Sequence, residues 1–213
     1  MDDLRNILII NPFGIGDVLF TTPLIAAIKD SLPEAKISYW CNERVKEIFK
    51  NDPRINKVFA LSRGDIKRIF QDSTLEGIKK SLGLFISLKK ERFDATLDFS
   101  LDHRYSALTK LLGIKKRTGF NYKKRGRFLT HRIDTSGYRN KHIIEHYLGL
   151  LQFFGIEPKT TKMQVFASES SLNRAKNILT QSGLICFLIS SALIFINTPG
   201  SASLLPRILL RLK

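Results

Sequence analysis

Short apolar runs alternate along the chain with longer stretches in which apolar positions recur every three or four residues. Residues 7–10 form a continuous apolar run, which is typical of a strand buried on both faces of a sheet. The next stretch places Leu24, Ile25 and Ile28 on one helical face and ends at Pro33. Repetition of this strand-then-helix pattern predicts an α/β fold, in which helices flank a parallel sheet.

The predicted elements cover most of the chain up to residue 182. After residue 184 the amphipathic spacing is lost, and no acidic residue follows Glu169. We therefore predict one α/β domain over 1–183 and an aberrant or truncated tail over 184–213. The predicted strands are 7–10, 37–40, 57–61, 95–98, 127–133 and 163–166, and the predicted helices are 18–31, 43–50, 75–90, 105–112, 141–154 and 168–182.

The chain has a large excess of positive charge. It carries 35 Lys and Arg against 19 Asp and Glu, a net charge of +16, which favours an anionic partner such as nucleic acid, an acidic membrane surface or a phosphorylated small molecule. Residues 1–60 are balanced, with 8 basic and 8 acidic side chains, whereas 61–145 carry 20 and 9. The densest basic cluster, 115–132, also holds Phe120, Tyr122 and Phe128, so a nucleic-acid-binding α/β module that stacks bases is one hypothesis.

Cysteine and histidine positions argue against a metal site. Cys41 and Cys186 lie far apart, which suggests neither a disulfide framework nor a cysteine zinc site and agrees with a reducing cytoplasm. His142, Glu145 and His146 match the H-x-x-E-H pattern of some zinc peptidases, but Glu157 and Glu169 are the only acidic residues downstream that could complete it. We expect no metal.

The longest apolar stretch, 184–196, is shorter than a membrane-spanning helix, so any membrane contact would be peripheral.

The segment after the first predicted strand, NPFGIGDV, is the strongest candidate for chemistry. Gly14 and Gly16 permit a tight turn and the close approach of a ligand. A dinucleotide fingerprint would need a third glycine where the chain has Leu19. Asp17 has two interpretations: it caps the helix that begins there, or it faces a cleft at the carboxyl edge of the sheet and accepts a proton from a hydroxyl group.

Several motifs together resemble the heptosyltransferase family, glycosyltransferase family 9. They are Gly16-Asp17 after the first strand, Thr22-Pro23, and Pro33-Glu34-Ala35. Further matches are FDATLDF, RYSALTKLLG, KRTGF and HIIEHYLGLLQFFGI, so that the resemblance covers about 5–182.

This resemblance implies the N-terminal half of a GT-B glycosyltransferase, a Rossmann-like domain that binds the acceptor sugar. The family transfers heptose from ADP-heptose to the lipopolysaccharide inner core, with inversion and without a metal or cofactor. Asp17 matches the catalytic base. Gly14, Gly16, Thr22, Arg63 and Arg104 are the expected acceptor-binding residues, the two arginines by a looser match.

The resemblance also sets the expected surroundings and limits of activity. An anionic acceptor at the inner face of the bacterial inner membrane would explain the basic excess better than a nucleic acid does, and it places the protein in the cytoplasm as a peripheral membrane protein. The second domain of the family holds the nucleotide-sugar donor, and here only FINTPGSAS, at 195–203, corresponds to its start. We therefore expect the chain alone to transfer little or no heptose.

Overall fold

The computed structural model describes residues 4–61, 63–135 and 141–181. The chain divides into two compact units, Met1–Gln164 and Val165–Lys213. In the described part of the second unit, one helix, α7 (Glu169–Gln181), forms from an amphipathic stretch close to the predicted range of 168–182. The predicted boundary at 183/184 lies outside the described residues.

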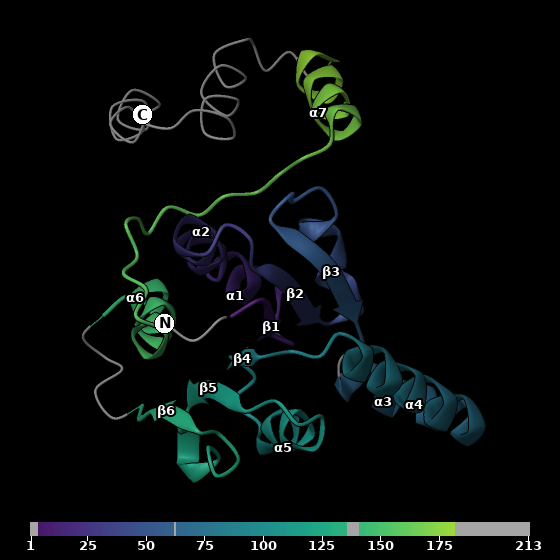
Figure 1. The fold of residues 1–213 in the computed structure, drawn as a ribbon. Coiled ribbons are helices and arrows are strands. Elements are labelled where there is room, and N and C mark those ends of the chain that lie inside the picture. Colours follow the sequence, from purple (N-terminus) through teal and green to yellow (C-terminus); the bar gives the residue numbers. More distant parts are fainter. Residues whose placement is uncertain (1–3, 62, 136–140, 182–213) are drawn as a thin grey trace. The chain divides into compact units, whose positions relative to one another are not determined.

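The first unit is an α/β domain built on a six-stranded parallel sheet, as the sequence predicted. The strand order is β3-β2-β1-β4-β5-β6, and Figure 1 shows β1 and β4 near the middle of the sheet. The strands are β1 (Asn6–Ile10), β2 (Lys36–Cys41), β3 (Ile55–Ala60), β4 (Ala95–Asp98), β5 (Lys116–Phe120) and β6 (His131–Ile133). The helices are α1 (Ile15–Leu19), α2 (Thr22–Ser31), α3 (Arg63–Asp72), α4 (Thr74–Lys90), α5 (His103–Leu111) and α6 (Ile143–Gly149), with 3-10 helices at Glu43–Phe49, Tyr122–Lys124 and Leu150–Phe154.

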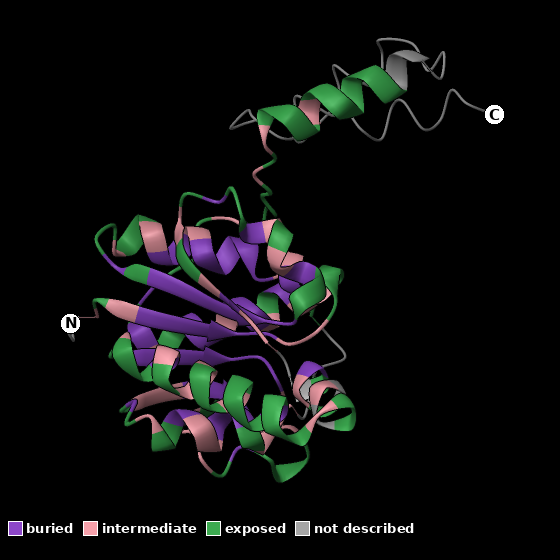
Figure 2. Ribbon diagram, turned by 90° about the vertical axis from the view of Figure 1, so that its right-hand side faces the viewer, coloured by how far each residue is buried: buried purple, intermediate pink, exposed green. Residues whose placement is uncertain are grey.

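Helices cover both faces of the sheet, which leaves the central strands buried (Figure 2). Alternate side chains of β1 point to opposite faces, as in any strand. Ile7 and Ile9 pack with α1, α2 and α6, whereas Leu8 and Ile10 pack in a second cluster with residues of α4 and α5. This two-sided burial is the reason for the continuous apolar run in the sequence.

The predicted helix 18–31 is two helices, a difference that Pro23 explains. Proline has no backbone N–H and therefore cannot bond to the carbonyl of Leu19 four residues earlier. The hydroxyl of Thr22 donates to that carbonyl instead, at 2.8 Å. The chain thus turns between α1 and α2, and α1 stays short.

The basic cluster at 115–132 contains a strand, β5, that the sequence pattern did not predict. Residues 116–120 form β5, whose amino-terminal residues Lys116 and Arg117 are charged, while Thr118, Gly119 and Phe120 are buried. The strand predicted at 127–133 is confirmed only over His131–Ile133. The strand predicted at 163–166 is wrong, because these residues have no regular secondary structure. Helix α3 was also missed, whereas α4 agrees with the predicted 75–90 to within one residue. Gly155 ends the last helical segment of this unit in a left-handed conformation, at φ 66°.

Candidate functional site

The candidate site lies where the strand order changes direction. Chain progression moves outward from β1 through β2 to β3 on one side and from β4 through β5 to β6 on the other. In open α/β sheets, the connections leaving the carboxyl ends of two such strands part to opposite sides and leave a crevice that binds ligands. Here these connections are the segment from Asn11 to Gly14 after β1 and the segment from Phe99 to Asp102 after β4.

Two buried asparagines hold the segment after β1. The Asn42 amide donates to the carbonyls of Pro12 and Phe13, at 3.1 and 2.6 Å. The Asn11 amide donates to the carbonyl of Asp17 at 3.0 Å, and its oxygen accepts from the N–H of Phe13 at 3.2 Å. These side chains satisfy backbone groups that no strand or helix pairs, and so they fix the path of the chain into α1.

A cavity of about 380 Å³ opens beside α1 at this edge of the sheet. Its walls come from the segment after β1, the turn after β4, the turn after β5 and helix α6. One carboxylate and three aromatic rings line it, which gives it one charged group on a largely apolar wall. The lining residues are Phe13, Asp17, Leu101, Tyr122, Thr135, Ile143 and Tyr147.

The Asp17 carboxylate is half-buried, and among the described residues it has no hydrogen-bond or ion-pair partner. The residue preceding α1 is Gly14, which offers no side-chain cap, and the Asp17 carboxylate accepts from no described backbone N–H. Helix capping therefore does not account for Asp17, while its place in the cavity wall leaves the carboxylate available to a ligand.

The turn after β4 brings a strained residue to the same cavity. Leu101 has φ 55°, a left-handed conformation that non-glycine residues seldom adopt. The turn is held by Ser100, whose N–H donates to the buried Asp98 carboxylate at 2.9 Å and whose hydroxyl donates to the carbonyl of Asp102 at 3.3 Å. Strain of this kind tends to occur where a side chain must be held for binding.

Burial raises the pKa of Asp98 to about 6, against its usual 3.8, and hydrogen bonds from Ser100 only partly offset this effect. A raised pKa in the folded state stabilises the protein below the unfolded pKa, and that contribution is lost as the pH rises through about 6. The loss amounts to about 3 kcal/mol. Asp98→Asn has no carboxyl to titrate, so its free energy of unfolding should not show this loss. The free energy of unfolding of the variant minus that of wild type, measured by urea unfolding, should therefore increase from pH 4 to pH 7. A constant difference across this range would contradict the assignment.

The structure brings Gly14, Gly16 and Asp17 together at the start of α1. Gly14 and Gly16 are exposed, and a Cβ atom at either would meet no protein atom within 4 Å. The surface beside Asp17 is therefore open to a ligand. Thr22 is 1% exposed and does not line the cavity. Its hydroxyl donates to the carbonyl of Leu19 at 2.8 Å and accepts from the N–H of Gln164 at 3.1 Å, so Thr22 stabilises the scaffold beside the site. Its contact with an acceptor stays a prediction.

The two predicted arginines differ in what can be said of them. Arg104 is an exposed residue in the first turn of α5, which follows β4, and so it lies at the same edge of the sheet as Asp17 without lining its cavity. Arg63 is the first residue of α3, and its side chain lies outside the described part of the structure.

Of the three aromatic residues in the basic cluster at 115–132, Phe120 is not available for base stacking. Phe120 is 3% exposed and packs in the core. The Arg117 guanidinium donates to the carbonyls of Phe128 and Ile114, which ties β5 to the segments that follow and precede it. This part of the cluster is structural, and it weakens the nucleic-acid hypothesis.

The H-x-x-E-H segment also has a structural explanation. His142 precedes α6 in an extended conformation, and its ring nitrogen accepts from the N–H of Ile144 at 3.3 Å, so it caps the helix and is not on the helical face with His146. Among residues 4–61, 63–135 and 141–181, no group of three or more His, Cys, Asp and Glu side chains is placed to hold a metal ion.

Sequence reasoning missed most of the cavity wall. Leu101, Thr135 and Tyr147 had no signal of their own, because each depends on a turn or helix brought in from a distant part of the chain. The asparagines were detectable in principle, since Asn11 and Asn42 directly follow two buried strands.

In the described part of the chain, no helix combines the length and the apolar character needed to cross a membrane.

Known proteins resemble this chain in sequence and fold. The profile of glycosyltransferase family 9 (heptosyltransferase) matches residues 82–195, past the predicted boundary at 183. Lipopolysaccharide heptosyltransferase 3 of Escherichia coli K12 is 22% identical over 171 residues, which cover 79% of this chain and 48% of that protein. The chain thus spans about half the length of the curated relatives it matches.

Solved structures agree with the fold. The family 9 glycosyl transferase from Veillonella parvula superposes with a TM-score of 0.69 at 18% identity, over 85% of this chain and 51% of that one. The E. coli heptosyltransferase WaaC with ADP gives a TM-score of 0.63 at 17% identity, over 75% and 51%. The family profile covers more than half of the residues, and on that basis the chain belongs to glycosyltransferase family 9, the heptosyltransferases.

Proposed function

We propose that this chain is the acceptor-binding half of a heptosyltransferase and that Asp17 is its catalytic base. The observation that carries the proposal is the Asp17 carboxylate, which has no partner among the described residues and lines a cavity at the β1/β4 edge of the sheet. Phe13, Tyr122 and Tyr147 give this cavity rings against which a sugar can pack, with one charged group to orient it.

In the proposed reaction, the carboxylate takes the proton of one acceptor hydroxyl as the oxygen attacks the anomeric carbon of the heptose. The new glycosidic C–O bond forms as the bond from that carbon to the phosphate oxygen breaks, and ADP leaves with the electron pair. Attack from the opposite side of the leaving group inverts the anomeric configuration. Neither step calls for a metal ion or a redox cofactor.

The identity of the donor and the acceptor rests on family membership. The E. coli relative is a lipopolysaccharide heptosyltransferase, and another member of the family was solved with ADP. We therefore propose ADP-heptose as the donor, bound by a second half whose length this chain does not span, and the lipopolysaccharide inner core as the acceptor. Such an acceptor places the protein at the cytoplasmic face of the inner membrane.

Binding of two kinds of anionic ligand, a core oligosaccharide and a single-stranded nucleic acid, tests this function. The purified chain should bind a Kdo-containing core oligosaccharide in a titration at fixed salt, and Tyr122→Ala should weaken that binding about tenfold, because the ring is one of the three aromatic rings that line the cavity. Lys124→Ala, at an exposed position in the same turn, is the matched control and should bind as wild type. Preferential binding of single-stranded DNA or RNA, falling steeply with salt, would instead favour the nucleic-acid module.

A further inference from the structure

Helix α4 (Thr74–Lys90) presents an apolar face to solvent. Four of the nine exposed large hydrophobic residues in the described part of the chain lie on it: Leu75, Ile78, Leu82 and Ile86, at 78, 53, 56 and 45% exposure. Their spacing of three and four residues places them on one side of the helix. Gly77 and Leu88 are the buried residues of α4, and Leu88 packs in the second core. The outward stripe is thus additional to the face that holds α4 on the sheet.

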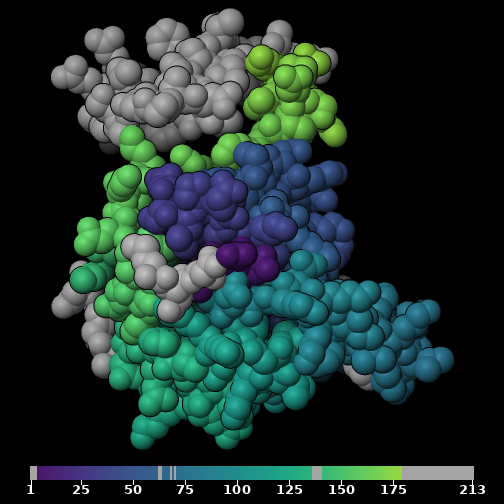
Figure 3. Space-filling view, in the orientation of Figure 1, coloured from purple at the N-terminus to yellow at the C-terminus, as the bar shows by residue number. Residues whose placement is uncertain are grey.

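Exposed lysines lie on the same helix as this apolar stripe. Lys79, Lys80, Lys89 and Lys90 are all exposed, against a single acidic residue in the helix, Glu76. Lys79 follows Leu75 by four residues, and Lys89 follows Ile86 by three, so both lie beside the stripe and not opposite it. The outer face of α4 combines apolar side chains with positive charge along its length, and in Figure 3 the blue-to-teal part of the chain that includes α3 and α4 projects from the side of the first unit.

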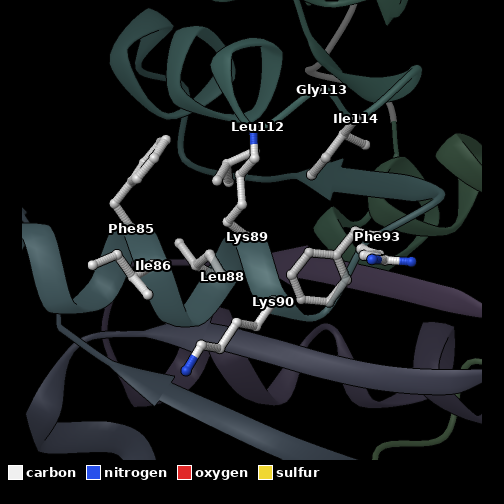
Figure 4. A pocket seen from close by; sticks show the side chains of 10 residues that line it. Phe85, Ile86, Leu88, Lys89, Lys90, Phe93, Leu112, Gly113 and Ile114 are labelled. Carbon is white, nitrogen blue, oxygen red and sulfur yellow. The ribbon is translucent and has the colours of Figure 1, made fainter.

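The stripe continues into a groove of about 740 Å³ between the carboxyl-terminal end of α4 and the turn from α5 to β5. Phe85, Ile86 and Leu112 line it, and the Lys89 side chain extends toward Leu112 whereas Lys90 points away (Figure 4). Arg92 adds a further exposed positive charge to the lining. The groove therefore has an apolar interior bordered by cationic groups.

We propose that the outer face of α4, together with this groove, docks on an anionic phospholipid leaflet. Apolar side chains flanked by Lys or Arg are the features by which a helix lies in the plane of a membrane surface. Charge complementarity favours this occupant over a second copy of the chain, because pairing two such faces would bring like charges together. The inference rests on the proposed function in one respect, namely that a lipid-linked acceptor would lie in that leaflet.

The position of α4 is compatible with simultaneous binding of the acceptor. The stripe belongs to the side of the sheet covered by α4 and α5, whereas the Asp17 cavity is built on α1 and α6 of the other side. Residues of the two surfaces do not overlap. Docking through α4 therefore leaves the cavity accessible.

Co-sedimentation with vesicles tests the proposal on the 213-residue chain. Vesicles of phosphatidylglycerol and phosphatidylethanolamine should bind the chain, and binding should fall with added salt. Each lysine near an anionic surface contributes about fivefold in affinity. Lys89→Gln with Lys90→Gln, and separately Ile78→Ser with Leu82→Ser, should each lower the partition coefficient by about tenfold or more. Because all four positions are exposed, the thermal unfolding midpoint should not change.

Matched controls locate the effect. Lys123→Gln with Lys124→Gln, exposed in the basic cluster, and Ile178→Ser, 56% exposed on α7, should bind vesicles within about twofold of wild type. Equal binding by all variants, loss of binding only in the Lys123/Lys124 variant, or no binding to phosphatidylglycerol vesicles would overturn the proposal. So would a dimer without lipid that the Ile78/Leu82 variant dissociates. Asp17→Asn should bind vesicles normally, so failure of docking and failure of the proposed function are distinguishable.

Discussion

Asp17→Asn is expected to reduce heptose transfer by about 10²- to 10⁴-fold, the usual contribution of a positioned general base. Asparagine keeps the size of the side chain but cannot take a proton from the acceptor hydroxyl. The carboxylate has no described partner that the change would leave unsatisfied, so the fold should remain intact. Reduced transfer with an unchanged unfolding midpoint would separate catalysis from stability.

The assay requires a donor site, because catalysis needs both reactants held together. We would join this chain to the second half of a family relative and measure ADP release with ADP-heptose and a core acceptor. The matched control is Asp30→Asn, which alters an exposed carboxylate on α2 and should leave the rate unchanged. A rate for Asp17→Asn within about threefold of wild type would contradict the assignment of the base.

Gly119→Ala should destabilise the domain by about 1 to 3 kcal/mol or more, because it over-packs the sheet. A Cβ atom on Gly119 would lie 2.6 Å from the backbone carbonyl oxygen of Asp98 and 3.1 Å from a methyl group of Leu129. The oxygen belongs to the neighbouring strand β4 and cannot move without disturbing the sheet. Urea unfolding should show a lower midpoint with an unchanged slope.

Gly83→Ala is the matched control for this substitution. Gly83 lies inside α4, where a Cβ atom would meet nothing within 4 Å, and alanine is the better helix former. We expect it to raise stability by about 0.5 to 1 kcal/mol. Equal effects of the two alanines would mean that β5 does not pack against β4 as described.

The parallel sheet was predictable because its strands carry their own signal. The continuous apolar run of β1 requires burial on both faces, and the amphipathic stretches between strands require helices. Strand β5 lacked this signal, since Lys116 and Arg117 occupy its first positions and only its carboxyl-terminal half is buried. The break before α2 could have been predicted from Pro23, whose missing N–H ends the hydrogen-bond pattern of α1.

The candidate site was predictable only in part. Asp17 stood out because a carboxylate follows two glycines after a buried strand. Thr22, from the same family motif, is buried and hydrogen-bonded within the scaffold, an environment that the motif alone does not reveal. Tyr147 and Leu101 reach the cavity only through the packing of α6 and the turn after β4, and sequence periodicity does not encode that long-range arrangement.

The most direct test of the central claim is a crystal structure of the chain with a Kdo-containing core oligosaccharide. We predict that the sugar occupies the cavity lined by Tyr122 and Tyr147, with one acceptor hydroxyl about 2.6 to 3.2 Å from the Asp17 carboxylate. Binding of the oligosaccharide at another surface, or with no hydroxyl in reach of Asp17, would contradict the assignment of both the acceptor site and the base.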